Sequence, residues 1–264
     1  MAACKVCNDP LIMEIEDDDG GDPQSVPDDL ELRACGCHFH WQCFLDQSAE
    51  VAISLKCPSC GAQLAANQAG PSVTNPFLRA SPGVSVLTRY TSEGGVDEDL
   101  DILPTITEEA YVAANPGTRP ARAYHVMCAE GDVEGIIDLL RDAEQQQEEG
   151  DLEGEEPPLN PTQIIRYQDP LAGNQSGLHL AVERGQEEVV WLLLWMASSL
   201  PARVFPEAAV QAAQAMGIQR PGAAVPPAED IRALQDDRGR TAEALAIEVG
   251  RGAWAVALHP GNSS

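Results

Sequence analysis

Five side chains that can ligate a metal lie within the stretch Cys35-Gly-Cys-His-Phe-His-Trp-Gln-Cys43. Outward from it, one Cys-x-x-Cys pair precedes the stretch at Cys4 and Cys7, and another follows it at Cys57-Pro-Ser-Cys60. Two thiolates at this spacing can converge on one metal ion, but a structural zinc site needs four ligands, so each pair needs another from elsewhere in the chain. The spacing predicts two tetrahedral zinc sites and permits sequential or interleaved pairing.

The N-terminal residues also bear on the chemistry of these cysteines. They read Met1-Ala-Ala-Cys-Lys-Val-Cys7 and contain no apolar core of the kind that a secretory signal requires, so we expect a cytoplasmic or nuclear protein. Thiols stay reduced there, which favours metal ligation over disulfides. Because the cysteine-rich segment contains few large apolar residues, metal binding should supply most of its folding free energy. Cys128 lies apart in an apolar helical pattern and is expected to be a buried thiol.

Residues 1–64 resemble a RING finger in their Cys-x-x-x-Phe-His-x-x-Cys middle and Cys-Pro-x-Cys ending. The resemblance implies a small α+β zinc-bound fold with interleaved pairing. By it, the first zinc is held by Cys4, Cys7, His40 and Cys43, and the second by Cys35, Cys37, Cys57 and Cys60. His38 could replace Cys37 as a ligand. We favour Cys37 because it keeps one residue after Cys35 and two before His40.

The resemblance to RING fingers implies a ubiquitin-protein ligase. Such a module binds a ubiquitin-charged conjugating enzyme and orients the thioester toward a substrate lysine, with no covalent intermediate and no catalytic residue on this chain. Val6 and Pro58 match the family's contacts with the conjugating enzyme. Further apolar candidates between Cys43 and Cys57 are Phe44, Leu45, Ile53 and Leu55. Both zincs are structural, because four protein ligands leave no position for water.

Two departures keep other functions open. Many active RING ligases carry a basic residue after the last cysteine, whereas this chain has Gly61, so the alternative is a non-enzymatic zinc-finger scaffold or adaptor. A PHD finger has the same ligand order and would make the chain a chromatin reader. Leu55 stands where PHD fingers usually carry a Trp, which favours the RING interpretation.

Three segments of the C-terminal half share one pattern, an apolar helix that ends in glycine. They are Tyr124–Gly131, Leu178–Gly185 and Glu243–Gly250. Apolar pairs at helical spacing follow each glycine, so each segment predicts a helix, a glycine turn and a second helix. The segments resemble ankyrin repeats in Leu178-His-Leu-Ala181 and in the turn signature Asp236-x-x-Gly239-x-Thr241.

The resemblance to ankyrin repeats implies an all-α helical array over residues 119–264 that recruits a protein substrate. Its repeats are predicted near 121–141, 174–197 and 236–259. The glycines are 54 and 65 residues apart, where an uninterrupted array would give about 33, so insertions interrupt it. One insertion predicts an extra helix, Pro206–Met216. We expect His179 to stabilise a turn, and Trp191 and Trp195 to act in packing or at an interface.

The formal net charge of -26 is concentrated in three runs. Windows 14–31, 93–109 and 142–156 hold 24 of the 42 acidic residues and no Lys or Arg. Such runs are typical of solvated linkers and repel phosphate backbones, so nucleic acid is not expected as a partner.

Residues 65–118 predict an acidic, Pro/Gly-rich linker with one helix, Thr107–Ala114. The longest apolar stretch, Val189–Ala197, is too short for the roughly 20 residues of a membrane span.

Overall fold

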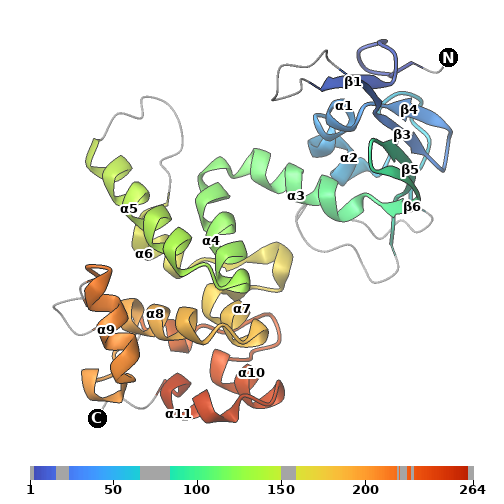
Figure 1. Cartoon of the computed structure of the whole chain (residues 1–264). Coiled ribbons are helices and arrows are strands. Elements are labelled where there is room, and N and C mark those ends of the chain that lie inside the picture. Colours follow the sequence, from blue (N-terminus) through green and yellow to red (C-terminus); the bar gives the residue numbers. More distant parts are fainter. Residues whose placement is uncertain are drawn as a thin grey trace. The chain divides into compact units, whose positions relative to one another are not determined.

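The computed structural model describes residues 3–15, 24–65, 84–149, 159–218, 220, 225–226 and 229–260. The chain is a mixture of helix and sheet in two compact units, Met1–Asn115 (unit 1) and Pro116–Ser264 (unit 2) (Figure 1). Unit 1 combines short helices with sheet, and the described part of unit 2 is mostly helical. No helix within the described ranges is long and apolar enough to cross a membrane.

Unit 1 contains a four-stranded antiparallel sheet in the order β4-β3-β5-β6. Its strands are β3 (Asp29–Leu32), β4 (Cys37–Phe39), β5 (Leu87–Ser92) and β6 (Gly95–Asp101), and β1 (Ile12–Ile15) and β2 (Gln24–Pro27) form a separate antiparallel pair. Leu30 and Leu32 are fully buried and alternate with half-buried residues, the period of a strand with one face on the core. Gly36, with φ of 64°, permits the tight turn into β4.

The described part of unit 1 also contains the helices α1 (Trp41–Leu45), α2 (Ser48–Ser54) and α3 (Leu103–Ala114). α3 packs against α2. Its buried residues recur at helical spacing: Leu103, Ile106, Thr107, Ala110 and Tyr111. α3 begins before Thr107, the start predicted from the sequence, because Pro104 is tolerated in a first turn and Asp101 Oδ1 accepts a hydrogen bond from the Leu103 N–H (3.1 Å).

Residues 84–115, which the sequence assigns to a linker, belong to unit 1. β5 pairs with β3, so the β5–β6 hairpin extends the sheet of the cysteine-rich segment. Ile102, Leu103 and Ile106 are buried in the same core as the cysteine-rich segment. The acidic composition is misleading because β6 is an edge strand, and charged side chains at an edge discourage further pairing. Of the rest of the predicted linker, Pro116–Thr118 forms a 3-10 turn at the start of unit 2. Residues 66–83 and much of the other two acidic runs lie outside the described residues.

Unit 2 is built mainly from helices. They are α4 (Arg119–Glu130), α5 (Val133–Glu149), α6 (Pro161–Ile165), α7 (Gly177–Arg184), α8 (Glu187–Ala197), α9 (Glu207–Ala215), α10 (Ala242–Glu248) and α11 (Ala255–Leu258). Short 3-10 turns lie at Pro116–Thr118, Pro170–Ala172, Ala202–Val204, Ile231–Ala233 and Gly252–Trp254. Strands β7 (Gln168–Asp169) and β8 (Gln175–Ser176) pair as a small hairpin. The predicted extra helix, Pro206–Met216, is confirmed as α9.

Three helix pairs follow the helix–glycine–helix pattern predicted from the sequence: α4–α5, α7–α8 and α10–α11. Gly131, Gly185 and Gly250 have φ of 87°, 82° and 77°. This left-handed conformation ends a helix with little cost for glycine. The first helices pack in sequence order, α4 on α7 and α7 on α10. The second helix of the third pair is reduced to a 3-10 turn and the four residues of α11.

Successive helix pairs contact each other through the same positions. Gln186 Nε2 donates to the Ala129 carbonyl (2.8 Å), and an Arg251 guanidinium N–H donates to the Glu183 carbonyl (3.1 Å). Each donor directly follows the glycine of its own pair, and each acceptor lies two residues before the glycine of the preceding pair. A contact that repeats in register is what a stack of similar units produces.

Two histidines repeat a second contact. His125 Nε2 lies 3.1 Å from the Tyr167 carbonyl, and His179 Nε2 lies 3.0 Å from the Arg240 carbonyl, so each reaches the turn before the next helix pair. At the start of α7, His179 Nδ1 also lies 2.8 Å from Oγ of Ser176, the residue directly before the helix. The turn-stabilising role predicted for His179 is confirmed.

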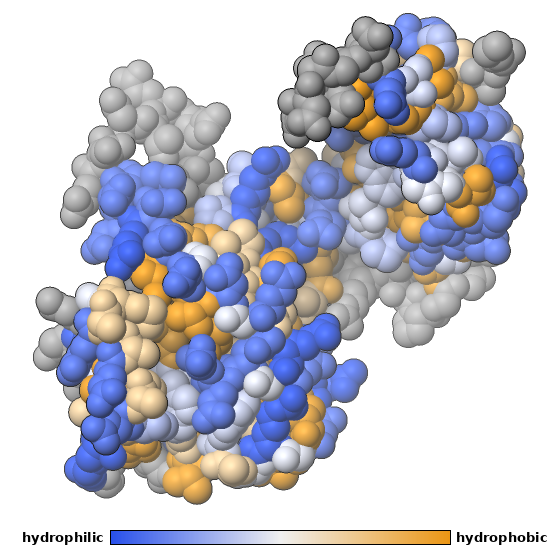
Figure 2. All heavy atoms as spheres, in the orientation of Figure 1, coloured by the Kyte–Doolittle hydropathy of each residue, from blue (hydrophilic) through white to orange (hydrophobic). Residues whose placement is uncertain are grey.

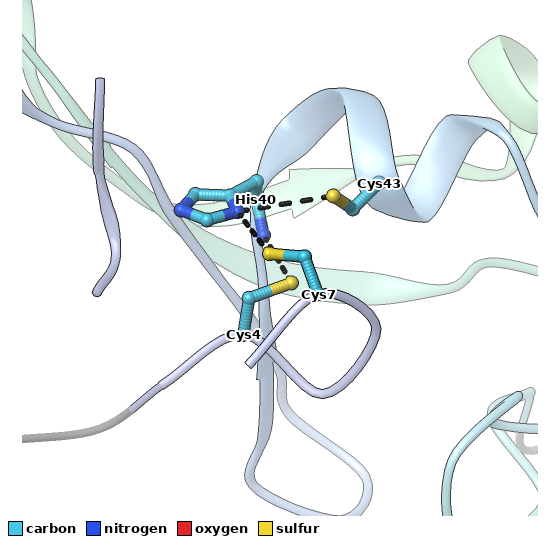
Figure 3. A group of neighbouring side chains, drawn as sticks. All are labelled: Cys4, Cys7, His40 and Cys43. Atoms are coloured by element: carbon cyan, nitrogen blue, oxygen red, sulfur yellow. Dashed lines mark hydrogen bonds between the residues drawn. The ribbon is translucent and has the colours of Figure 1, made fainter. Parts of the chain in front are cut away.

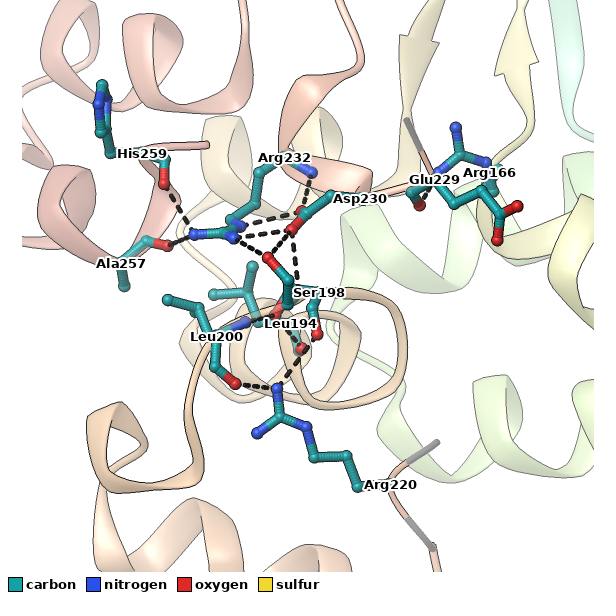
Figure 4. A network of polar contacts seen from close by, with 11 residues as sticks. Arg166, Leu194, Ser198, Leu200, Arg220, Glu229, Asp230, Arg232, Ala257 and His259 are labelled. Atoms are coloured by element: carbon teal, nitrogen blue, oxygen red, sulfur yellow. Dashed lines mark hydrogen bonds and ion pairs between the residues drawn. The ribbon is translucent and has the colours of Figure 1, made fainter. Parts of the chain in front are cut away.

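A buried ion pair connects the segment that precedes the third helix pair to the segment that follows it (Figure 4). Arg232 has no exposed surface, and its guanidinium contacts Asp230 through two hydrogen bonds of 2.9 and 2.7 Å. The same guanidinium donates to the His259 carbonyl (2.7 Å), and Asp230 accepts from the backbone N–H of Ser199 (2.9 Å). The pair therefore joins the chain after α8 to the chain after α11.

Candidate metal centres

The eight residues predicted as ligands form two groups of four. Within each group the ligand atoms all lie within 4.8 Å of one another. The first group is Cys4, Cys7, His40 and Cys43 (Figure 3), and the second is Cys35, Cys37, Cys57 and Cys60. Ligands of the two groups alternate along the chain, so the pairing that the spacing left open is interleaved.

The two Cys-x-x-Cys pairs have the same backbone structure. The N–H of Asn8 donates to the Cys4 carbonyl, and the N–H of Gly61 donates to the Cys57 carbonyl, both at 2.9 Å. Asn8 and Gly61 also share a left-handed conformation, with φ of 65° and 72°. Asn and Gly adopt this conformation most readily, so the residue that follows each pair is suited to the tight turn that directs both sulfurs toward one point.

His40 is oriented toward the first group by its second ring nitrogen. Its Nε2 lies 2.8 Å from the Pro10 carbonyl, so in the neutral ring Nε2 carries the proton and donates. Nδ1 then has its lone pair available and lies 3.3 Å from Cys7 Sγ and 3.8 Å from Cys43 Sγ. The backbone N–H of His40 contacts Cys4 Sγ at 3.4 Å. Figure 3 shows these three sulfurs gathered around Nδ1 and the His40 backbone.

These distances fit a tetrahedral ion. Zinc with bonds of about 2.3 Å to sulfur and about 2.0 Å to nitrogen separates the two ligand atoms by about 3.5 Å. The sulfur-to-Nδ1 distances of 3.3 and 3.8 Å lie on either side of that value. Thiolate and imidazole donors suit zinc, and a set of four protein ligands leaves no open position for water. Each group could hold one zinc ion in a closed, structural site.

The thiols within each group differ in acidity. The pKa of Cys60 is lowered to about 7, chiefly because its sulfur accepts a hydrogen bond from the Ala62 backbone. Burial raises the pKa of Cys4, but backbone hydrogen bonds from Cys7, His40 and Val6 bring it down to about 7. Burial raises the pKa of Cys35 and of Cys43 to about 12. Each group thus combines one readily ionised thiol with one that releases its proton when a metal replaces it.

His38 belongs to neither group. Its Nδ1 lies 2.7 Å from Asp29 Oδ1, whereas Cys37, its neighbour, is buried among the ligands of the second group. Successive side chains of a strand point to opposite faces, so β4 cannot direct both residues to one ion. Of the two alternatives, the structure brings Cys37 to the second group. Cys128 is fully buried in unit 2, outside both groups, as predicted.

A contact that sequence reasoning missed braces the first group. Asp28 is buried and accepts hydrogen bonds from the backbone N–H of Trp41 (3.1 Å) and from Tyr90 Oη (3.0 Å). The rings of Trp41 and Tyr90 also pack together, with centroids 4.8 Å apart. Trp41 directly follows the ligand His40, so strand β5 supports the metal-binding segment from outside residues 1–64.

The residues predicted to contact a conjugating enzyme lie at the surface of unit 1. Val6 is 41% exposed, and Pro58 is half-buried. Of the four further apolar candidates, Phe44, Leu45 and Leu55 are buried in the core, whereas Ile53 is 41% exposed. Ile53 is therefore the candidate from this segment that is available to a partner, which the sequence pattern could not distinguish.

Comparisons with protein-family models, with curated proteins and with solved structures found no match to this chain. The features that bear on function are therefore the two ligand groups, the surface of unit 1 and the stacked helix pairs of unit 2.

Proposed function

We propose that the chain is a RING-type ubiquitin-protein ligase that holds two structural zinc ions. Unit 1 binds a ubiquitin-charged conjugating enzyme and orients its thioester for attack by a substrate lysine, and the ankyrin-like unit 2 recruits the substrate. The observation that carries the proposal is the interleaving of two closed four-ligand groups, because it matches the pairing that the RING resemblance implies. Catalysis then rests on proximity and orientation.

The surface of unit 1 supports docking of a conjugating enzyme. Val6 and Ile53 are exposed large apolar residues, and Pro58 lies in the turn between the last two cysteines. Exposed apolar side chains on a structured unit are favourable contacts for a protein partner. Val6 and Pro58 each lie inside a Cys-x-x-Cys turn, so metal binding would fix their positions.

The stacked helix pairs of unit 2 support a role in recruitment. Their contacts repeat in register from one pair to the next, as in repeat proteins that present an extended surface to other proteins. The ankyrin resemblance implies the same role, and its class of partner is a protein substrate.

The second candidate function is a non-enzymatic adaptor that joins proteins through both units. The observation that favours it is Gly61, which follows the last ligand at φ of 72° and has no side chain to contact ubiquitin. By the RING resemblance, a basic residue at this position activates the thioester. A chain that docks a conjugating enzyme without such a residue would join proteins and transfer ubiquitin slowly.

A reconstituted assay separates the two functions. The full zinc-loaded chain is incubated with activating enzyme, ubiquitin, ATP and a panel of conjugating enzymes. The ligase proposal predicts ubiquitin chains that Cys35→Ala abolishes and that Val6→Arg reduces at least tenfold with two zincs retained. Val96→Arg is the matched control, because Val96 is also an exposed valine of unit 1, on strand β6. If none of the conjugating enzymes in the panel gives ubiquitin chains, the ligase proposal is contradicted and the adaptor function is favoured.

A further inference from the structure

Unit 2 contains a groove of about 830 Å³ between α8, α9 and the turn from α4 to α5. One wall is α9, the helix that interrupts the spacing of the helix pairs. Figure 2 shows the weakly hydrophobic surface of α9 beside a strongly hydrophobic patch, with hydrophilic side chains around both. The size suits several side chains of a bound molecule.

The floor of the groove is apolar and rigid. Val189 and Leu192 of α8 are buried, and the half-buried Trp191 and the buried Trp195 extend the floor. Both indole rings pack on Phe205, with centroids 6.0 and 5.1 Å away, so the packing role predicted for them is confirmed. Such packing holds the rings in place, which lowers the entropy cost of binding against them.

The part of the groove that α9 contributes is lined by small side chains, with Met216 directly after the helix. Ala208, Ala209 and Ala212 of α9 line the groove, and Ala212 is exposed. Alanine leaves space where a larger residue would fill the groove. The groove therefore exists because the extra helix presents alanines to α8.

The rim is acidic. Asp132 and Glu134 lie at the start of α5, and Glu187 and Glu188 lie at the start of α8; all four are exposed and line the groove. Asp132 Oδ1 accepts from the Gly135 N–H (2.9 Å), and Glu187 Oε1 accepts from Trp191 Nε1 (3.3 Å), so both have structural contacts as well. Among the described lining residues, none is a lysine or arginine.

Two arginines lie near the groove without neutralising its rim. Arg141 donates to the Met216 carbonyl (2.8 Å) and pairs with Asp138 (3.3 Å). Arg220 packs over the rings of Trp195 and Phe205 and donates to the Ser198 carbonyl (3.1 Å). Arg141 is paired with Asp138, and Arg220 donates to the carbonyls of Ser198 and Leu200, so both guanidinium groups are directed to partners other than the four rim carboxylates.

We propose that this groove binds a basic, apolar peptide segment of a partner protein. Apolar side chains of the segment pack on Trp191, Leu192 and the alanines of α9, and its Lys or Arg side chains pair with the carboxylates of the rim. A second copy of this chain is a poor occupant because both copies carry a net charge of -26. The acidic rim likewise repels nucleic acid.

This inference deepens the proposed function, because it names the class of protein that unit 2 recruits, and it rests on that function for the consequence of binding. Binding itself is measured without conjugating enzyme or ubiquitin. If the protein binds basic peptides but forms no ubiquitin chains, the ligase proposal is wrong and the groove proposal stands. If it forms ubiquitin chains but does not bind basic peptides, the groove proposal is wrong and the ligase proposal stands.

The test selects a phage-displayed library of random 12-residue peptides against the full zinc-loaded chain. Enriched peptides are expected to carry at least two Lys or Arg beside Leu, Ile, Phe, Met or Trp, and to bind less tightly as salt is raised. Their synthetic forms are then titrated against variants. Ala212→Phe, which fills the groove, should weaken binding at least tenfold. Ala215→Phe is the matched control, because Ala215 is an exposed alanine of the same helix outside the groove lining.

Charge reversal tests the rim separately. Glu134→Lys with Glu188→Lys should weaken binding at least tenfold, whereas Glu144→Lys, at an exposed position of α5 outside the groove lining, should change it less than twofold. The proposal is overturned by no enrichment, by enriched peptides without basic residues, or by equal binding to the Ala212→Phe and Ala215→Phe variants. Self-association of the chain that Ala212→Phe abolishes would also overturn it, since the occupant would then be a second copy.

Discussion

Unit 1 and unit 2 differ in what fills their interiors. In unit 1, Cys4, Cys37 and Cys57 are part of the buried core, so metal ligands occupy space that apolar side chains would otherwise fill. In unit 2, one core of buried residues runs through all three helix pairs and includes Ile136, Leu193 and Leu245. With the zinc ions proposed above, the first unit should depend on an added metal, whereas the second should fold without one.

The difference follows from how each segment is connected. The ligands of each group in unit 1 come from segments far apart in the sequence, and a metal that joins such segments contributes folding free energy directly. The helices of unit 2 bury apolar stripes against their neighbours and need no cross-link. Disturbing one support at a time should therefore affect one unit at a time.

Metal removal should have the largest effect. Chelation, or Cys57→Ala, should unfold unit 1, because structural zinc supplies about 10 kcal/mol or more of folding free energy in small metal domains. Unit 2 should keep its protected amides in hydrogen-exchange mass spectrometry. Cys128→Ala, the same substitution outside both groups, should retain two zincs per chain. Unfolding of both units on chelation would show that the contrast between them is wrong.

Removing the buried ion pair should have the converse effect. Arg232→Ala leaves Asp230 with an uncompensated charge in the interior, which costs about 3–5 kcal/mol. Urea unfolding followed at unit 2 should show this loss while the zinc content stays constant. Arg238→Ala, at an exposed arginine of the same segment, should change the stability little. A loss of zinc from the Arg232→Ala chain would contradict the independence of the units.

Mild acid should destabilise unit 2 by a smaller amount. Burial is the main reason that the pKa of His125 is lowered from 6.5 to about 4, against the opposing effects of the Tyr167 carbonyl and Asp169. Between these two values, His125 binds a proton in the unfolded chain but not in the folded chain. The contribution of neutral His125 to stability is therefore fully present above pH 6.5 and is lost as the pH falls toward 4. Linkage gives a loss of about 2 kcal/mol between pH 7 and 5.

The measurement is urea unfolding of unit 2 at both pH values, with His125→Gln as the comparison because glutamine does not titrate. The remaining dependence of that variant should come largely from His179, whose pKa burial also lowers. Asp230 and Asp236 should contribute only at lower pH, since their pKa values lie below 3.8. An unchanged pH dependence in His125→Gln would remove His125 as the cause.

The parts of the molecule that the sequence predicted are those whose chemistry is local. A Cys-x-x-Cys pair needs only four residues to bring two thiols together, and a glycine ends the helix directly before it, so spacing alone predicted the ligand types and the three helix pairs. The interleaved pairing came from the RING resemblance, and the structure brings the same residues together. His38 and Cys37 could be separated only once β4 showed them on opposite faces.

The β5–β6 hairpin could not be predicted because its partner is distant in sequence. Leu30 pairs with Tyr90 across 60 positions, and an acidic edge strand has the composition of a linker. The groove of unit 2 was missed for a related reason, since α9 was predicted as a helix but nothing in its sequence indicated that it packs on α8.

The smallest predicted effect tests whether that hairpin supports the metal-binding segment. Burial, assisted by Asp28, raises the pKa of Tyr90 to about 12, so the phenol stays protonated and donates to Asp28. Tyr90→Phe keeps the ring against Trp41 but removes this hydrogen bond, which should cost about 1 kcal/mol. Unit 1 should then lose zinc at a lower chelator concentration, whereas Ser92→Ala at the end of β5 should leave that concentration unchanged. Equal chelator resistance in the Tyr90→Phe and native chains would mean that the hairpin extends the sheet without bracing the first metal group.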